Sequence, residues 1–310
     1  MPFSHHSHSG QFCKHASGML EDVVLSAIGR GFLLYGLTEH VPRYRASDLY
    51  PEEADMSLTS LAKQFQDFVN EAHRLKAAYS QQINLLVGLE TEYITTLDLD
   101  HLDNLLQACE NQIQFLVGSI HHVNGIPIDF DIDTYHRAVN SLGKANREQA
   151  QEEFIVSYLD AQYEVLRRFH PEIIGHIDLC RLYTPELRFS DYPRAHKKLV
   201  RNIQFATGYG ALFEVNSAAL RKRWDTPYPG KDVIELIYQE GGHLTISDDS
   251  HSPHAVGVNY DRVRHYLESV GIKELWYLKE STTRNAGGRM VIPEQLPGDW
   301  WTHPFWTQPL

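Results

Sequence analysis

Residues 84–90 read NLLVGLE, a short apolar run that ends in a carboxylate. A continuous apolar run of this length is typical of a strand that is buried on both faces, as in a parallel sheet covered by helices. Similar runs recur at residues 32–37, 115–120, 173–177, 211–215 and 243–247. With PFSHHSH at residues 2–8 as the opening strand, the sequence predicts seven buried strands.

Amphipathic helical patterns separate these strands. The clearest runs from Leu58 to about Tyr79, where apolar residues recur at spacings of three and four. Others are predicted at residues 20–29, 98–109, 147–169, 191–207, 231–240 and 259–270. Strands that alternate with helices indicate an α/β fold, here a seven-stranded (β/α)7 TIM-like barrel. We expect one domain over residues 1–310, with an aromatic, proline-rich tail (about 290–310) packed on it.

The composition favours a small-molecule ligand over nucleic acid. The chain has 40 acidic and 28 basic residues and a formal net charge of -12, so it lacks the basic excess that binds a phosphate backbone. No apolar run approaches the roughly 20 residues that span a bilayer. Three widely spaced cysteines and the lack of a signal-like leader suggest a reducing compartment. We therefore expect a cytoplasmic protein that binds neither nucleic acid nor membrane, and we leave the oligomeric state open.

Histidine is enriched, at 18 of 310 residues, and several histidines lie close to the first residue. Such a leader can be a purification tag, which would be excluded from fold reasoning. The rest of the chain argues against a tag, because potential ligands follow every predicted strand. In chain order these ligands are His6 and His8, His40, Glu90, His121, His176, Glu214 and Asn216, and Asp249 and His251.

The carboxyl ends of the strands in a βα barrel meet at one rim, so these side chains should converge there. A cluster of neutral imidazoles with a few carboxylates is typical of a metal centre. In the H-x-H pattern, His6 and His8 point to the same face of a strand and can bind one ion. His5 points the other way, and we expect it to be structural or exposed.

Seven segments of the chain carry a resemblance to a known family. They are HSHSGQFCKH at the start, GLTEH ending at His40, VGLETE around Glu90, GSIHH at His121, IGHIDLCR at His176, FEVNSAALRK from Phe213 and SDDSH ending at His251. As a set they resemble the PHP (polymerase and histidinol phosphatase) superfamily of metal-dependent phosphoesterases. Within it, the first segment, GSIHH and SDDSHSPHAVG look most like the monofunctional histidinol-phosphate phosphatases. The resemblance covers most of the chain and implies a distorted seven-stranded barrel.

The resemblance also implies three divalent transition-metal ions and their ligands. Carried over residue by residue, one ion is held by His6, His8, Glu90 and Asp249. Glu90 bridges to a second ion, which His121 and His176 complete. The third ion is held by His15, His40 and His251. All these positions carry residues that can ligate a metal, and Zn, Fe and Mn all suit such mixed nitrogen and oxygen sites.

The implied reaction is hydrolysis of L-histidinol phosphate to L-histidinol and phosphate in histidine biosynthesis. A phosphate monoester dianion repels nucleophiles, so the site must neutralise charge and supply hydroxide, for example as a hydroxide that bridges two metal ions. We expect Glu90, Asp249 and His251 to be catalytic. The resemblance supports Arg181 and Arg221 as phosphate ligands, since a guanidinium group matches phosphate oxygens, although either can be a surface arginine.

Several other polar residues have two interpretations. His122 and His254 either donate a proton to the leaving alkoxide or line the mouth of the pocket. Glu39, Glu92 and Glu214 either meet the ammonium group of the substrate or are simply solvated or paired.

Two segments that resemble other features are interpreted as structural. DFDIDTY at residues 129–135 is similar to the start of a calcium loop, but Thr134 stands where glycine is required, so Asp133 is interpreted as a helix N-cap. In the tail, Trp300, Trp301, Phe305 and Trp306 are predicted to lie along the outside of the barrel or in an oligomer contact.

Two alternative functions remain open. Related barrels attached to polymerases cut or proofread nucleic acid, so this chain can be a PHP-type phosphoesterase or nuclease with another substrate. The acidic balance argues against that interpretation. A non-catalytic barrel that senses metal or phosphate would require a broken ligand set, and the sequence shows none.

Overall fold

The central sheet is a barrel of seven parallel strands within the described residues, 2–307 except 145 and 223, of the computed structural model. The strands, in spatial order, are β1 (Phe3–Ser4), β2 (Leu34–Leu37), β3 (Asn84–Glu90), β4 (Phe115–Gly118), β7 (Ile173–Ile174), β8 (Leu212–Asn216) and β9 (His243–Ser247). Beyond the ends of β1 and β9, Ser7 pairs with Ser250, and the His8 N–H donates to the Ser250 carbonyl at 2.7 Å. The sheet thereby closes on itself, and the predicted seven-stranded barrel is confirmed.

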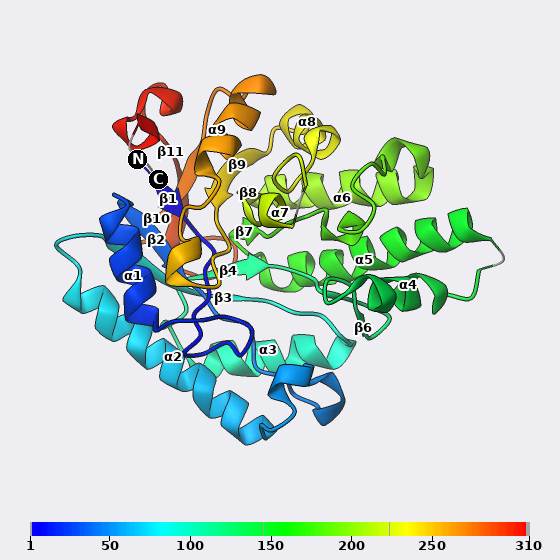
Figure 1. Cartoon of the computed structure of the whole chain (residues 1–310), viewed down its shortest axis with the longest axis horizontal. Coiled ribbons are helices and arrows are strands. Elements are labelled where there is room, and N and C mark those ends of the chain that lie inside the picture. Colours follow the sequence, from blue (N-terminus) through cyan, green and yellow to red (C-terminus); the bar gives the residue numbers. More distant parts are fainter. Residues whose placement is uncertain (1, 145, 223, 308–310) are drawn as a thin grey trace.

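Helices surround this sheet (Figure 1). Those that connect successive strands are α1 (Leu20–Gly29), α2 (Leu58–Ala78), α3 (Thr96–Ala108), α5 (Arg147–Phe169), α6 (Pro193–Tyr209) and α8 (Lys231–Gln239), and α9 (Tyr260–Ser269) follows the last strand of the barrel. Each begins and ends within two residues of its predicted position. On α2 the predicted apolar face is buried through Phe65, Phe68 and Leu75, and burial of such a side chain contributes about 1.5–3 kcal/mol.

Side-chain caps fix where several helices begin. The Ser57 hydroxyl accepts the Ser60 N–H at the start of α2, and the Asn146 side chain accepts the Gln149 N–H at the start of α5. A further helix, α4 (Ile132–Asn140), begins at Ile132, and its cap is Asp131, whose carboxylate accepts the Thr134 N–H at 2.6 Å. The prediction that Asp133 caps this helix is therefore wrong, because Asp133 already lies inside the first turn.

A hairpin that the sequence did not predict covers the amino-terminal end of the barrel. It consists of β10 (Trp276–Glu280) and β11 (Val291–Gln295), paired antiparallel. The Trp276 ring stacks on His243, the first residue of β9, and the Leu278 N–H donates to Nε2 of His5 at 3.0 Å. The opposite end of the barrel is left for the polar residues that follow the strands.

The remaining elements are short. β5 (His122–Val123) and β6 (Ile126–Pro127) form a small hairpin after β4, and α7 (Ala218–Arg221) follows β8. In the aromatic tail, Trp300 and Phe305 are buried, and the Phe305 ring packs against Phe32 and Tyr260. Residues 308–310 of the predicted tail lie outside the described residues. No helix in the described part of the chain is long and apolar enough to cross a membrane.

Candidate metal centre

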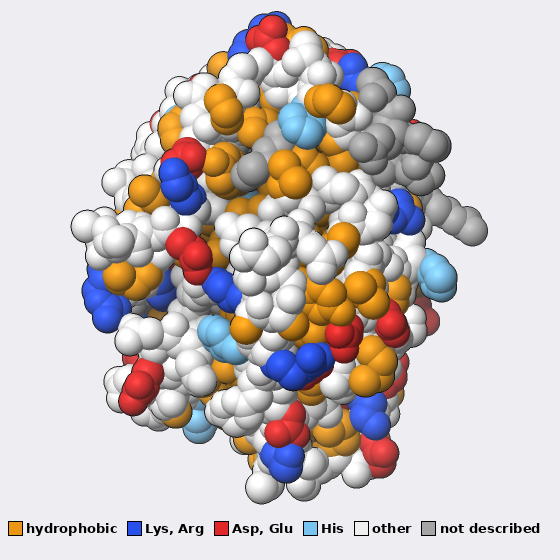
Figure 2. Space-filling view, turned by 90° about the vertical axis from the view of Figure 1, so that its left-hand side faces the viewer, with side chains coloured by type: hydrophobic (Ala, Val, Ile, Leu, Met, Phe, Trp, Pro, Cys, Tyr) orange, Lys and Arg blue, Asp and Glu red, His pale blue; other side chains and the backbone are white. Residues whose placement is uncertain are grey.

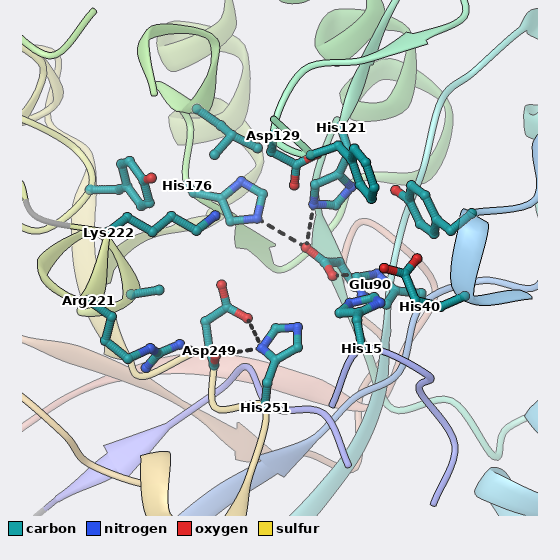
Figure 3. Close-up of a pocket in the computed structure, with 16 residues that line it drawn as sticks. His15, His40, Glu90, His121, Asp129, His176, Arg221, Lys222, Asp249 and His251 are labelled. Carbon is teal, nitrogen blue, oxygen red and sulfur yellow. Dashed lines mark hydrogen bonds and ion pairs between the residues drawn. The ribbon is translucent and has the colours of Figure 1, made fainter. Parts of the chain in front are cut away.

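Glu90, the last residue of β3, lies at the centre of a histidine cluster on the carboxyl rim of the barrel (Figure 3). Imidazole nitrogens from five histidines lie within 3.3 Å of its two carboxylate oxygens: His6, His8, His40, His121 and His176. These histidines follow four different strands, β1, β2, β4 and β7. Parallel strands thus bring residues from distant parts of the sequence to one carboxylate.

Asp249, which follows β9, lies on another side of the same cluster. Its Oδ1 atom is 3.7 Å from Nε2 of His6, 3.6 Å from Nε2 of His8 and 3.5 Å from Nδ1 of His251. Asp249 adopts a left-handed backbone conformation with φ of 48°. Aspartate tolerates this region better than most residues, and such backbone strain gathers at functional sites.

A third group of imidazoles lies beside these two carboxylates. The His15 ring is 5.2 Å from the His40 ring and 5.1 Å from the His251 ring. His15 comes from the loop between β1 and α1, which also carries Cys13. Overlapping groups of ligand atoms that lie within 4.8 Å of one another contain all nine predicted metal ligands, together with Cys13.

Buried carboxylates orient three of the histidines. Glu214 contacts Nδ1 of His6 at 2.9 Å, Glu39 contacts Nδ1 of His8 at 3.3 Å, and Glu92 contacts Nδ1 of His121 at 3.0 Å. An Nδ1–H that donates to a carboxylate leaves the Nε2 lone pair for a metal ion. The structure therefore supports the paired interpretation of Glu39, Glu92 and Glu214, which lie behind the histidines and do not line the cavity.

The imidazoles and carboxylates in this centre favour one another's charged forms, as their pKa values show. Burial alone would lower the pKa of His6, but Glu90, Asp249 and Glu214 raise it well above its usual value. Burial is likewise outweighed at His8, where Glu39 and Glu90 raise the pKa to about 9. Burial would raise the pKa of Glu90, but the neighbouring imidazoles hold it well below its usual range. A metal ion that binds here replaces protons held between these groups.

In the third group of imidazoles the pKa values are lowered instead of raised. Burial, together with the positive charge of His8, lowers the pKa of His15 to about 4 and that of His251 to about 3. The same two causes lower the pKa of His40 well below its usual value. These three side chains are therefore neutral at pH 7, which is the form in which histidine ligates a metal.

Unpaired polar atoms test whether this donor set fits a metal ion. Nε2 of His6, His8 and His40 and Oε2 of Glu90 are buried without a hydrogen-bond partner. Buried polar groups are nearly always paired, so several unpaired atoms in one cluster need an explanation. Imidazole nitrogens and carboxylate oxygens are suitable ligands for Zn, Fe or Mn, and the residues therefore fit a divalent transition-metal ion.

A cavity of about 380 Å³ opens beside the cluster. Seven of the predicted metal ligands line it, namely His15, His40, Glu90, His121, His176, Asp249 and His251, and so does Arg221. His6 and His8 are completely buried behind these residues. The cavity is also lined by polar residues that sequence reasoning did not assign to the site: Tyr50, Glu52, Asp129, Lys222 and Tyr228.

A family model described as "PHP domain" matches residues 4–218, which run from the last residue of β1 through β8. The chain belongs to the PHP domain family. The inferred resemblance to this superfamily is confirmed.

Two curated relatives of this PHP protein match it over nearly their full lengths. A Schizosaccharomyces pombe protein named "Probable histidinol-phosphatase" is 44% identical, and the match covers 92% of each chain. A Saccharomyces cerevisiae protein named "Histidinol-phosphatase" is 32% identical over 98% of each chain. Among solved structures, histidinol phosphate phosphatase from Lactococcus lactis, complexed with zinc, L-histidinol and phosphate, matches with a TM-score of 0.64. That match has 19% identity, covers 93% of this chain and 98% of the other, and supports the fold alone.

The two arginines predicted to bind phosphate lie in different places in this PHP domain. Arg221 lines the cavity, and its guanidinium group donates to the backbone carbonyls of Asp248 and Asp249. Arg181 does not line it. Its guanidinium group is buried and forms ion pairs with Asp178 and Asp232, and its contact with phosphate stays a prediction.

The two candidate proton donors also lie outside the cavity of this PHP domain. His122 is buried, and its Nδ1 is 3.1 Å from Glu92, while neither His122 nor His254 is among the lining residues. Some of the residues that were missed had a weak signal in the sequence. Lys222 directly follows Arg221, and Cys13 lies two residues before His15, but adjacency alone does not show which side chains reach a common point.

Proposed function

We propose that this chain hydrolyses L-histidinol phosphate to L-histidinol and phosphate, the phosphatase step of histidine biosynthesis. The observation that carries the proposal is the cluster of imidazoles around Glu90, which opens onto a cavity that also holds two cationic side chains. The names of the curated relatives and the ligands of the Lactococcus lactis structure support the choice of substrate.

We assign three metal ions to the cluster. His6, His8, Glu90 and Asp249 hold the first, Glu90, His121 and His176 the second, and His15, His40 and His251 the third. Divalent ions bound there supply Lewis-acid charge neutralisation and hydroxide at neutral pH. Glu214, Glu39 and Glu92 keep the ligand imidazoles of His6, His8 and His121 in the tautomer that presents Nε2 to the cluster.

Arg221 and Lys222 are the proposed phosphate ligands. Two backbone carbonyls hold the Arg221 guanidinium group at the edge of the cavity, at 2.8 Å and 2.6 Å, and leave further N–H donors free for phosphate oxygens. Lys222 points across the cavity toward His176 (Figure 3). Together they place positive charge on the side of the cavity that is next to Asp249.

Asp129 is the proposed partner of the cationic end of the substrate. It lies beside His121, across the cavity from Arg221 (Figure 3), and Glu52 lines the same cavity. L-Histidinol phosphate carries its phosphate and its ammonium group at different positions. A cavity with cationic and acidic groups on opposite sides would bind such a molecule in one orientation.

The size and charge of the protein favour a small ester over nucleic acid. The cavity of about 380 Å³ is at the lower end of the range of small-molecule sites, roughly 300–1,000 Å³. On the face shown in Figure 2, basic and acidic side chains are interspersed. The three cysteines, Cys13, Cys109 and Cys180, are free and buried, and we place the enzyme in the cytoplasm, where thiols stay reduced.

The proposal is tested by a substrate panel with metal analysis of the same sample. We expect two to three metal equivalents per chain, and phosphate release from L-histidinol phosphate that is much faster than from a mononucleotide. An Asp129→Asn variant should raise KM for L-histidinol phosphate and leave KM unchanged for an analogue that lacks the ammonium group. Asp133→Asn, an exposed change outside the cavity, is the matched control. Strong, salt-sensitive binding of single-stranded DNA without monoesterase activity would contradict the proposal.

A further inference from the structure

Among the described residues of the ligand cluster, Cys13 is the one side chain that the proposed function does not use. Its Sγ atom lies 3.3 Å from Nε2 of His15, and the ligand atoms of Cys13, His15, His40 and His251 all lie within 4.8 Å of one another. The side chain is buried, with 6% of its surface exposed. The thiol is therefore enclosed by the protein, whereas the His15 imidazole that it contacts is exposed and lines the cavity.

The backbone holds Cys13 and His15 against the segment that carries His251. The Cys13 N–H donates to the Ser9 carbonyl at 2.8 Å, which closes a turn, and the Ser17 N–H donates to the His251 carbonyl at 2.8 Å. Gly10 makes this turn possible, because a Cβ atom there would lie 2.5 Å from Cα of Ser17. The position of the thiol is therefore fixed by the fold of the loop.

One ring nitrogen of His40 lacks a hydrogen-bond partner, which indicates that a ligand is missing from the group formed by Cys13, His15, His40 and His251. Nδ1 of His40 contacts Glu90 at 2.9 Å, whereas Nε2 is buried and has no hydrogen-bond partner. Three imidazoles and a thiol make a donor set that suits tetrahedral zinc. Zinc–sulfur and zinc–nitrogen bonds of about 2.3 Å and 2.0–2.1 Å place two such ligand atoms about 3.5 Å apart at a tetrahedral angle, close to the observed contact.

We infer that Cys13 is a fourth ligand of the third ion, which makes this position a thiolate–imidazole site selective for zinc-like cations. The inference rests on the metal centre of the proposed function. A thiolate favours zinc or cobalt over manganese or magnesium, which prefer oxygen ligands. Four protein ligands leave no open position on a tetrahedral ion. The third ion would then act on the cavity through its charge, while the other two positions, which are built on Glu90, stay open to substrate.

Cobalt substitution tests this inference by spectroscopy. The full-length protein is stripped with a chelator and reloaded with Co²⁺, and the near-ultraviolet absorption is recorded. We expect a thiolate-to-cobalt charge-transfer band in the wild type and in Cys109→Ala, because Cys109 is buried at the carboxyl end of α3, away from the cluster. The band should disappear in Cys13→Ala and Cys13→Ser, which should also bind the third ion at least about 10–100-fold more weakly.

The outcomes separate this inference from the proposed function. A wild-type enzyme that turns over L-histidinol phosphate but shows no charge-transfer band would overturn the role of Cys13 and leave the phosphatase proposal standing. A band that persists in Cys13→Ser would also overturn it. Conversely, a Cys13-dependent band in a protein that releases no phosphate would support the ligand assignment and contradict the phosphatase. The wild-type spectrum decides the question even if a Cys13 variant fails to fold.

Discussion

Buried carboxylates are fully paired at the amino-terminal end of the barrel, whereas at the carboxyl rim some of their atoms have no hydrogen-bond partner. At the amino-terminal end, the carboxylate of Glu172 is bound by the Arg289 guanidinium group at 2.7 Å and 2.8 Å, and also accepts the Leu116 N–H. At the carboxyl rim, Glu90 is surrounded by imidazoles, and its Oε2 atom has no hydrogen-bond partner. Complete pairing stabilises the amino-terminal end, whereas the rim keeps ligand atoms available for a cation.

Two adjacent histidines show the same difference. His5 and His6 are both completely buried. Both ring nitrogens of His5 have partners, the Thr245 hydroxyl and the Leu278 N–H, and burial lowers its pKa to about 3. Nε2 of His6 has no hydrogen-bond partner and faces Glu90 and Asp249. His5 was expected to be structural or exposed, and its burial and its two partners support the structural alternative. Burial alone therefore does not distinguish a structural histidine from a candidate ligand, whereas the pairing of its nitrogens does.

The largest expected effect is at the centre of the rim. Glu90→Gln removes the charge that all five imidazoles share while keeping the shape of the side chain. We expect loss of bound metal and a decrease in kcat of roughly a thousandfold or more, because metal ions supply several kcal/mol of transition-state stabilisation. Metal analysis measures the loss of bound metal, and the rate of phosphate release from L-histidinol phosphate measures the decrease in kcat. Glu92→Gln, which removes the charge beside both His121 and His122, should weaken metal binding by about 10–100-fold. A fully loaded, active Glu90→Gln variant would refute the central role of Glu90.

At the opposite end, Arg289→Met should affect stability instead of chemistry. Removing the guanidinium group leaves Glu172 buried without its ion pair, and we expect the free energy of unfolding to fall by about 3–5 kcal/mol. Urea denaturation measures the loss, and metal content per chain should be unchanged. Arg284→Met is the matched control, since Arg284 is exposed and its removal should cost about 0–1 kcal/mol. If Arg289→Met lost metal but not stability, the proposed division between the two ends would be wrong.

The smallest expected effect is the pH dependence that His5 contributes. The pKa of His5 is about 3 in the folded chain and 6.5 as its ordinary value. Below pH 6.5 the unfolded chain therefore binds a proton that the folded chain does not, so stability falls as the pH falls, with a slope that approaches about 1.4 kcal/mol per pH unit. His5→Gln lacks this contribution. Denaturation of the chelator-treated protein between pH 6.5 and 5.5 should show a shallower decline for the variant, and identical slopes would contradict the assignment.

The local pattern of apolar residues predicted most strands and helices of the barrel, because each type of element has its own apolar periodicity. The apolar runs ending near His40, Glu90 and His176 marked strands, and the known geometry of a βα barrel then implied that their last residues meet. The hairpin of β10 and β11 was missed. Its strands have mixed burial, and Pro293 within β11 weakens the strand pattern.

Partners that are distant in the sequence could not be predicted. Arg181 has the residue type and position expected of a phosphate ligand, but Asp232, which lies 51 residues later, holds its guanidinium group. The carboxylates behind the ligand imidazoles were recognised as strand-end residues without a definite role. Only the positions of Glu214 behind His6 and of Glu92 behind His121 show that they orient ligands.

The sequence by itself determined the α/β barrel, the order of its strands and helices, and the residues that would gather at one rim, because these follow from apolar periodicity and from the parallel direction of the strands. Only the tertiary structure decided which buried polar atoms are paired and which are left for a ligand. That distinction depends on distances between side chains far apart in the chain, such as His5 with Leu278 and His6 with Glu214, and no local pattern encodes those distances.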